Sequence, residues 1–443
     1  MAGAGARVGL ITALASRADI PIFPVLGVGG RRAAFALAAL PGVRVVDHPR
    51  AAALLLVVGR PTRALLRPLL VVHDLLPPPR ATVWWQVGAG GEDLVAALPS
   101  TVIATTGEVA GLRTVFGDLV SGRRPSDRPA LPDIEPAPWR GIGPYGQGGS
   151  GMTGGVPFGR PLPSRSADPD GLELDELPLH VGPLFPPLPP GLELHLEVQG
   201  DVLRRASVGE NPFTRWPGDP ALGPLDTSDF LGALDAPVMV AHLELARARH
   251  HLRWAASAVA LHGLRAEAHR LRHLAERVCV GDHPSVVALA RRLGRCRSLA
   301  STMAGIGVLD GGDAPPGPVA RAGGRGHDAR LDDPAYEGLG FEPVVHVAGD
   351  AWDRFLQRVG EAAQALELAG RAGDRLRSPG PPVEGPRGLL DASEVPPSQK
   401  LLSLLPDLLE GQEWGDAMTT IISLDIDVEE AAAGAEVQAL VEP

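Results

Sequence analysis

The chain has 443 residues, which is enough for two or three domains and a large buried core. Charged residues make up 21% of it, as in ordinary globular proteins, whereas its 55 glycines and 45 prolines indicate long irregular stretches. The formal net charge of -11 argues against nucleic acid as the main partner, because phosphate binding needs a basic surface.

The cysteines and the apolar runs limit the cofactors and the cellular location. Cys279 and Cys296 lie too far apart for a CxxC pair, and two thiols are too few for a four-thiolate iron–sulfur or zinc site held by this chain alone. The longest apolar run, from Ala51 to Val58, is much shorter than the ~20 residues that cross a bilayer. Because the N-terminus lacks the apolar core of a signal peptide, we expect a cytoplasmic protein without a membrane span.

Residues 1–120 alternate short apolar runs with helical patterns, and we expect them to form one domain. Strands are predicted at 43–46, 53–58, 82–87 and 101–105, and helices at 31–40, 61–76 and 91–98. Such alternation is typical of a parallel sheet covered by helices. The sequence therefore predicts a flavodoxin-like three-layer α/β domain.

The segment from Leu26 to Gly30, LGVGG, allows two interpretations. The first is a dinucleotide-binding loop, although the complete GxGxxG pattern and a convincing acidic residue about twenty positions later are missing. The second is a tight turn between a strand and a helix, which is the interpretation that we favour.

Residues 121–176 form a connector rich in Gly, Pro, Ser and Asp. A flexible linker and an ordered loop laid along a partner or an interdomain cleft are both compatible with this composition. Tyr145, Met152 and Phe158 are spaced among the glycines and favour the ordered loop, because a pure linker rarely carries such residues.

Residues 177–443 form the third predicted segment. Apolar residues alternate with polar ones from Leu192 to Val198, which predicts a half-buried strand. The stretch from Pro237 to Val278 has a helical pattern that is broken near Gly263.

The long helix carries a polar row. Glu244, Arg247 and His251 follow one another at spacings of three and four residues, so they share one face. One interpretation is a charge-coupling relay, and the other is a set of satisfied polar residues in a bundle core. Both remain open at this point.

Histidines later in the same stretch raise the question of a metal site. His269 and His273 share a face, and His262 lies less than two turns away. Pairs at this spacing arise by chance in a helix rich in Arg and His, and no HExxH motif occurs. We therefore predict no metal site.

Charged residues also mark the segment from Gly317 to Glu361. In its first half they lie between Gly and Pro, which predicts an irregular loop held by charge-assisted hydrogen bonds. Its second half has a helical pattern that follows an N-cap at Asp350. The charged residues concerned are Arg321, Asp328 and Arg330 in the loop and Asp353 and Arg354 in the helix.

These motifs resemble the D-type subunit of the NADH-quinone oxidoreductases (respiratory complex I), within the nickel–iron hydrogenase large-subunit-like family. The family patterns GPxxRAxG, DxRxxxP and GDxxDRxLxR run from Gly317 to Arg358, and ELxRIxxHLxWL matches from Glu244 to Trp254. A further match, EGPRG, adds Arg387 to the polar set. The resemblance implies an α+β domain with a long-helix bundle and a small antiparallel sheet over residues 177–443.

The stretch from His48 to Gly91 resembles the B-type subunit of the same enzymes, so the order of motifs is that of a B-type and a D-type chain fused end to end. The B-type family holds a four-iron cluster on four cysteines. Here Val28 and Gly29 lie near the expected tandem pair, and Gly90 stands at the third position. The chain lacks these thiolates, and it also lacks the two CxxC pairs of a nickel–iron centre, so neither group is expected.

In the D-type family, the quinone headgroup cavity is lined by a GPxHP loop. The matching positions here are Gly182, Pro183, Phe185 and Pro186. The resemblance makes quinone a candidate ligand at this loop, but Phe185 stands in place of the histidine and cannot donate a hydrogen bond to a quinone oxygen. We assign no catalytic residue.

Three functions follow from these observations. The first is a cytoplasmic subunit, peripheral on the inner face of the cell membrane, that lacks its own redox centre and serves as a scaffold or coupling module. Its partners would be the membrane-embedded subunits of a complex I-like, membrane-bound-hydrogenase-like or antiporter-like assembly. The second is an oxidoreductase subunit that receives electrons from an iron–sulfur subunit and reduces quinone in a remodelled cavity. The third is a soluble nucleotide-binding α/β protein.

The cysteine count generates a direct prediction. Protein purified anaerobically should contain iron and acid-labile sulfide at close to zero per chain, because two distant thiols cannot hold a four-iron cluster. Stoichiometric iron with a broad visible absorption band would contradict this.

Overall fold

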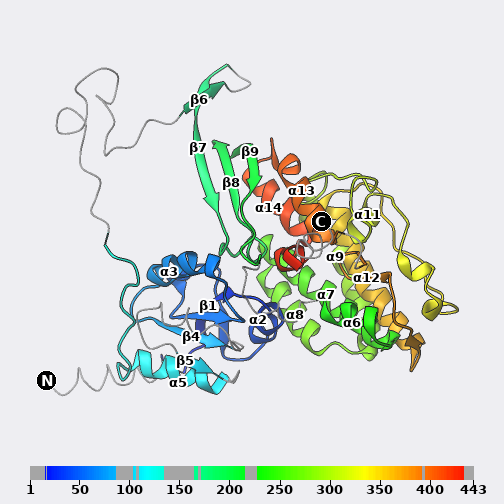
Figure 1. Cartoon of the computed structure of the whole chain (residues 1–443), viewed down its shortest axis with the longest axis horizontal. Helices are drawn as coiled ribbons and strands as arrows, with labels where there is room; N and C mark the ends of the chain where they lie inside the picture. The colour runs from blue at the N-terminus through cyan, green and yellow to red at the C-terminus, as the bar shows by residue number, and fades with distance from the viewer. Residues whose placement is uncertain are drawn as a thin grey trace, which may run out of the picture.

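The computed structural model describes residues 15, 17–85, 103–105, 109–133, 164–167, 171–214, 227–391 and 395–433. An α/β unit formed by the N-terminal part of the chain lies beside a helical unit formed by the C-terminal part, and an antiparallel sheet stands where the two meet (Figure 1). The predicted helix at 91–98 and the residues Tyr145, Met152 and Phe158 lie outside the described residues.

The α/β unit contains a parallel sheet whose strand order is β2-β1-β3-β4-β5. Its strands are β1 (Ile20–Leu26), β2 (Val43–Val45), β3 (Leu54–Val58), β4 (Ala81–Trp85) and β5 (Ile103–Thr105). Strands β2 to β5 agree with the predicted ones, and the full burial of β3 and β4 explains their unbroken apolar runs. Strand β1 was not predicted, because Pro21 and Pro24 each remove a backbone donor from what is a central strand.

Helices cover both faces of this sheet. Helices α2 (Arg31–Ala38) and α5 (Val109–Val120) pack on one face, through Leu37, Leu112 and Phe116 among others. Helix α3 (Leu66–Leu75) packs on the opposite face, where Leu69 and Val72 contact Phe23 and Trp84 in a second apolar cluster. Helices α2 and α3 lie within predicted helices, whereas α5, which ends where the predicted domain ends, was not predicted.

The turn from β1 to α2 is a close crossing of two backbones. Val28 forms an isolated antiparallel bridge with Arg60, next to the end of β3. A Cβ atom on Gly27 would lie 2.3 Å from the carbonyl carbon of Arg60, and one on Gly30 would lie 2.2 Å from the carbonyl oxygen of Val58. Glycine is required here by packing, as the strand-to-helix interpretation of this segment expects.

The antiparallel sheet has the order β6-β7-β8-β9. It consists of β6 (Ser164–Ala167), β7 (Glu173–Val181), β8 (Leu194–Gln199) and β9 (Val202–Val208). The alternating residues Leu194 and Leu196 face a core shared with α13 (Pro397–Leu409) and α14 (Trp414–Leu424). Strands β6 and β7 begin before residue 177, so the sheet includes residues that the sequence analysis assigned to the connector.

The helical unit is built on two long helices, α7 (Val240–Leu261) and α12 (Ala351–Ala372), which pack against each other. Helix α7 ends as predicted near Gly263, which has a φ of +80°. The neighbouring helices are α6 (Ser228–Asp235), α8 (Arg265–Arg277), α9 (His283–Gly294), α10 (Arg297–Ser301) and α11 (Pro318–Ala322).

Two short ladders complete the helical unit. They pair β10 (Val238–Met239) with β11 (Leu376–Arg377), and β12 (Val383–Glu384) with β13 (Leu389–Leu390). Within the described ranges, none of the helices is both long and apolar enough to cross a membrane.

The crossing at Gly30 gives a stability prediction. Gly30→Ala should lower the free energy of unfolding by at least about 2 kcal/mol, because the new methyl group meets a backbone carbonyl that cannot rotate away. The control is Gly232→Ala in α6, where nothing lies within 4 Å of the added atom, and we expect a gain of up to ~1 kcal/mol there. Urea unfolding measures the free energy of unfolding of both variants, and equal changes would contradict the close approach of the two backbones at Gly30.

Candidate functional site: a buried network of paired charges

The polar row on α7 is buried in the middle of the helical unit. Glu244, Arg247 and His251 are each at most 1% exposed. Arg247 donates to the Glu244 carboxylate over 3.3 Å and to the backbone carbonyls of Glu384 and Gly385 over 2.6 and 2.9 Å. Arg247 therefore faces β12 and the start of the loop that leads to β13.

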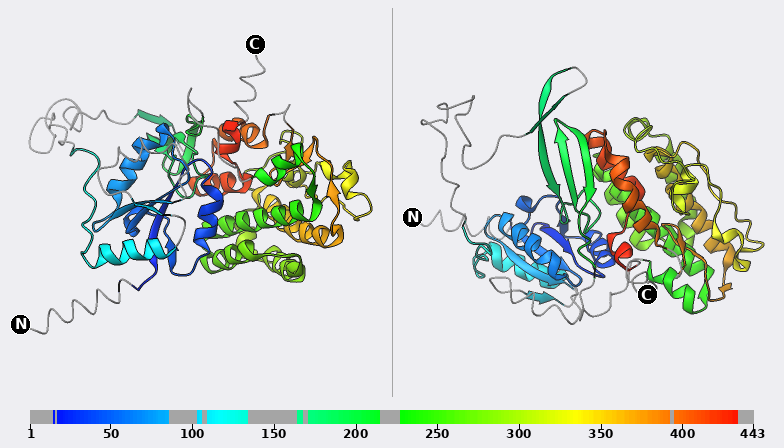
Figure 2. Two further views of the ribbon diagram at one scale, coloured as in Figure 1. Left: turned by 60° about the horizontal axis from the view of Figure 1, so that its bottom comes forward. Right: turned by 45° about the horizontal axis from the view of Figure 1, so that its top comes forward.

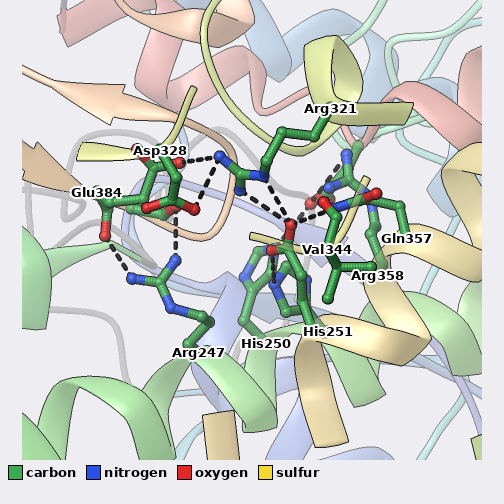
Figure 3. A network of polar contacts seen from close by, with 12 residues as sticks. Arg247, His250, His251, Arg321, Asp328, Val344, Gln357, Arg358 and Glu384 are labelled. Carbon is green, nitrogen blue, oxygen red and sulfur yellow. Dashed lines mark hydrogen bonds and ion pairs between the residues drawn. The ribbon is translucent and has the colours of Figure 1, made fainter. Parts of the chain in front are cut away.

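Arg321, from α11, is the centre of the network (Figure 3). Its guanidinium group lies 2.9 Å from the Glu361 carboxylate, 2.8 Å from that of Glu384 and 3.0 Å from that of Asp328. All four side chains are almost completely excluded from solvent. Burial alone would lower the pKa of Arg321, but the three carboxylates outweigh it and raise the pKa above its usual value.

Arg330 connects this centre to the polar row on α7. It lies 2.8 Å from the Asp328 carboxylate and 3.2 Å from that of Glu244. The Tyr336 hydroxyl donates to the other oxygen of Glu244 over 2.6 Å. Burial opposes the ionisation of Asp328, yet Arg330 and Arg321 lower its pKa to about 2, so the Asp328 carboxylate is charged at neutral pH.

His251 lies at the opposite side of the centre, beside Glu361. Its Nε2 atom is 3.2 Å from Oε2 of Glu361, and Gln357 donates to Oε1 of the same carboxylate over 2.6 Å. Burial is the main influence on the pKa of His251 and lowers it to about 3, although the Glu361 carboxylate acts in the opposite direction. His251 is therefore neutral at pH 7.

A second cluster surrounds Asp425, which ends α14 with a φ of +57°. Its carboxylate lies 2.7 Å from Nε2 of His250 and 4.0 Å from the guanidinium of Arg358. Burial would raise the pKa of Asp425, but His250, Arg387 and Arg358 together lower it well below its usual range. Because His250 and His251 are neighbours on α7, this cluster adjoins the centre around Arg321 (Figure 3).

The second cluster continues to the α/β unit. Arg387 lies 3.1 Å from the Asp427 carboxylate, and Arg31 of α2 lies 2.7 Å from the same group. Glu429, two residues later, accepts a hydrogen bond of 2.8 Å from the backbone N–H of Gly29. The segment after α14 thus joins the turn between β1 and α2 to the helical unit.

The other predicted polar residues lie apart from the network. Asp353 caps the loop before α12, where its carboxylate accepts from the N–H groups of Val347 and Ala348. Arg354 is buried, but it donates to Ser423 and to the carbonyls of Gly307 and Gly349. The contacts of Asp353 and Arg354 are thus with loop backbone and with Ser423 of α14.

The sequence analysis missed several members of the network. Arg358 and Glu361 follow Arg354 on the buried face of α12 at helical spacings of four and three residues. This spacing is a signal from which both could have been predicted. Glu384 is the first residue of the EGPRG match, so a signal for it was available too. The other missed members have partners that are distant in the chain: Tyr336, His250, Asp425, Asp427 and Glu429.

The residues Gly182, Pro183, Phe185 and Pro186 lie in the loop between β7 and β8. The Phe185 ring lies 6.4 Å from that of Trp414 and is 37% exposed. A small hollow that Pro190, farther along the same loop, helps to line holds about 10 Å³, space for one water molecule. It is lined by Leu26, Gly27, Arg31, Pro190, Phe213, Asp427 and Glu429. A quinone headgroup does not fit that hollow, which none of Gly182, Pro183, Phe185 and Pro186 lines.

An iron–sulfur cluster does not fit the turn between β1 and α2 either. Val28 and Gly29 offer no side-chain donor, and the turn is held by the carboxylate of Glu429. Cys279 and Cys296 lie at the start of the turn before α9 and just before α10, in the helical unit. Gly90 lies outside the described residues.

The histidines considered for a metal site have no third ligand beside them in the described part of the chain. The rings of His269 and His273 are in edge contact, 4.3 Å apart, whereas His262 ends α7. Among the residues that the structure describes, no group of three or more His, Cys, Asp or Glu side chains is arranged to hold a metal ion.

One known protein family matches the part of the chain that contains much of this network. Residues 297–390 match the family described as the 49 kDa subunit of respiratory-chain NADH dehydrogenase. The match lies in the part of the chain that resembles the D-type family, and it includes Arg321, Asp328, Arg330, Glu361 and Glu384.

Curated relatives show the same likeness over a shorter stretch. The D 1 subunit of NADH-quinone oxidoreductase from Salinispora tropica and that from Salinispora arenicola are each 43% identical to the chain over 67 residues. The corresponding D-type subunit of Mycobacteroides abscessus has the same identity over the same length. Each match covers 15% of this chain and 15% of the relative, so the chain spans about a seventh of the length of these relatives.

Among solved structures, a chain of the membrane-bound sulfane sulfur reductase, an archaeal respiratory membrane complex, aligns with 58% of this chain and 98% of its own length. The TM-score is 0.45 and the identity is 18%, so nothing further rests on this likeness.

Removing one cation from the network should destabilise the folded protein. Arg247→Ala should lower the free energy of unfolding by about 3 kcal/mol or more, because it leaves Glu244 and two buried carbonyls without their donor. Arg291→Ala, at an exposed position on α9, is the matched control and should change it by less than about 0.5 kcal/mol. Equal unfolding midpoints for the two variants would show that Arg247 is solvated.

The low pKa of His251 predicts a pH dependence. The unfolded chain takes up a proton at this residue below about pH 6.5, whereas the folded chain does so only near pH 3, so stability falls as the pH falls between these values. Between pH 7 and pH 5, the free energy of unfolding of the parent protein should therefore fall by about 2 kcal/mol more than that of His251→Gln. Urea unfolding at both pH values measures this, and an unchanged loss in the variant would mean that His251 titrates normally.

Proposed function

We propose that the chain is a peripheral subunit of a complex I-like or membrane-bound-hydrogenase-like assembly, in which a domain of the B type and a domain of the D type are joined in one polypeptide. The observation that carries the proposal is the buried network around Arg321, which lies in the segment similar to the 49 kDa subunit family. The strand order β2-β1-β3-β4-β5 supports a flavodoxin-like N-terminal domain, because it is the order of that doubly wound class.

Within this assembly the chain serves as a scaffold and coupling module without a redox centre of its own. The turn near the expected cluster offers no thiolate, and the loop that resembles the quinone site carries Phe185. These substitutions disfavour electron transfer to quinone in a remodelled cavity. The nucleotide alternative is disfavoured because the glycines of the β1 to α2 turn are required by backbone packing and Glu429 binds there.

Coupling through the network has a simple electrostatic basis. The guanidinium groups of Arg321, Arg330 and Arg358 stand between the carboxylate of Asp425 at one end and that of Glu244 at the other. In a dry interior a change of charge at one end alters the energy of every neighbouring pair. The membrane-embedded partners would be affected through the loops that hold these pairs.

Fractionation of the native host tests the proposal. The chain should sediment with membranes and be released by high-salt or alkaline washing, because the described helices include none that could anchor it. Expressed without its partners, it should stay in the supernatant. A chain found only in the supernatant of its own host, or one that resists washing when expressed alone, would contradict a peripheral subunit.

A further inference from the structure

Strand β7 exposes an unusual number of leucines. Leu172, Leu174, Leu177 and Leu179, in and just before the strand, are 60, 40, 50 and 37% exposed. Exposed apolar residues are ordinary when scattered, but a contiguous group in one strand marks an interaction site.

The leucines lie on both faces of the strand. Leu177 and Leu179 stand opposite Val198 and Leu196 of β8, so they extend the apolar face that packs against α13. Leu174, three residues before Leu177, therefore points to the other face of the sheet. A partner that covers only one face leaves half of these leucines in water.

Part of one edge of the same strand, on a projecting hairpin, has no partner strand among the described residues. Strand β6 pairs with β7 only from Glu173 to Glu176, and in the described part of the chain no strand pairs with that edge between Leu177 and Val181. Figure 2 shows this hairpin standing out beyond β8 and β9. An exposed apolar edge of this kind favours pairing with another chain.

Acidic side chains accompany the leucines. Asp175 is paired with Arg165 of β6 over 3.1 Å, whereas Glu173 and Glu176 have no ion-pair partner among the described residues. Acidic groups are repelled by anionic lipid headgroups, and a flat membrane surface would reach one face of the strand only.

We propose that this arm, β6 together with residues 172–179, docks into an apolar slot rimmed by lysines and arginines on a partner protein. The slot would clasp both faces of the arm, and its basic rim would meet Glu173 and Glu176. The inference rests on the proposed function only in taking that partner to be a subunit of the same assembly.

Photo-crosslinking in the native host tests it. A photoreactive phenylalanine analogue replaces Leu177 in one tagged version of the full chain and Leu376, an equally apolar exposed site on β11, in another. The Leu177 version should form one major product with another protein, attached within a few residues of a lysine or arginine. A product with a second copy, with lipid alone, or no product at all would overturn the proposal.

Charge reversal supplies the second arm of the experiment. Glu173→Lys with Glu176→Lys should lower the yield of that product about tenfold, because like charges would then face each other across the rim. Asp374→Lys, at an exposed site far from β7 in the chain, should leave the yield unchanged. If the charge-reversed Glu173 and Glu176 variant gave the same yield of crosslinked product as the Asp374→Lys control, the proposed rim of lysines and arginines on the partner would be wrong. The wider functional proposal is tested separately: it fails if the tagged wild-type chain does not sediment with membranes.

Discussion

The ion pairs of Arg321 are the interaction on which the helical unit depends. A guanidinium group without access to water is tolerated only when carboxylates surround it, and here they come from three separate elements: the loop after α11, α12 and β12. Those elements are far apart in the sequence and cannot move independently while the charges stay paired. The same rule explains why Arg330, the next cation along, is shared between Asp328 and Glu244.

The same constraint joins the two halves of the chain. Asp427 pairs with Arg387 of the helical unit and with Arg31 of the α/β unit, and Glu429 holds the turn before α2. In the B-type family this turn carries cluster ligands. In this chain a carboxylate from the C-terminal segment binds the turn, so an internal contact stands where the resemblance implies a cofactor.

Much of the fold was predictable because it depends on local patterns. Strands β2 to β5 and the break at Gly263 follow from apolar runs and a glycine, and the polar row on α7 follows from helical spacing. Strand β1 was missed because its prolines argue against a central strand. The network could be predicted only in part. Arg321 and Arg330 were recognisable from motifs, but partners such as Glu384 and Asp425 are set by tertiary contacts between residues that are distant in the chain.

The most direct test of the whole account is the identity of the proteins bound to the chain in its own host. The tagged full-length chain is purified from host membranes in mild detergent, and its stoichiometric partners are identified by mass spectrometry. The account predicts membrane-embedded subunits in a fixed ratio to the chain. A chain that purifies alone, or only with proteins that have no membrane span, would contradict it.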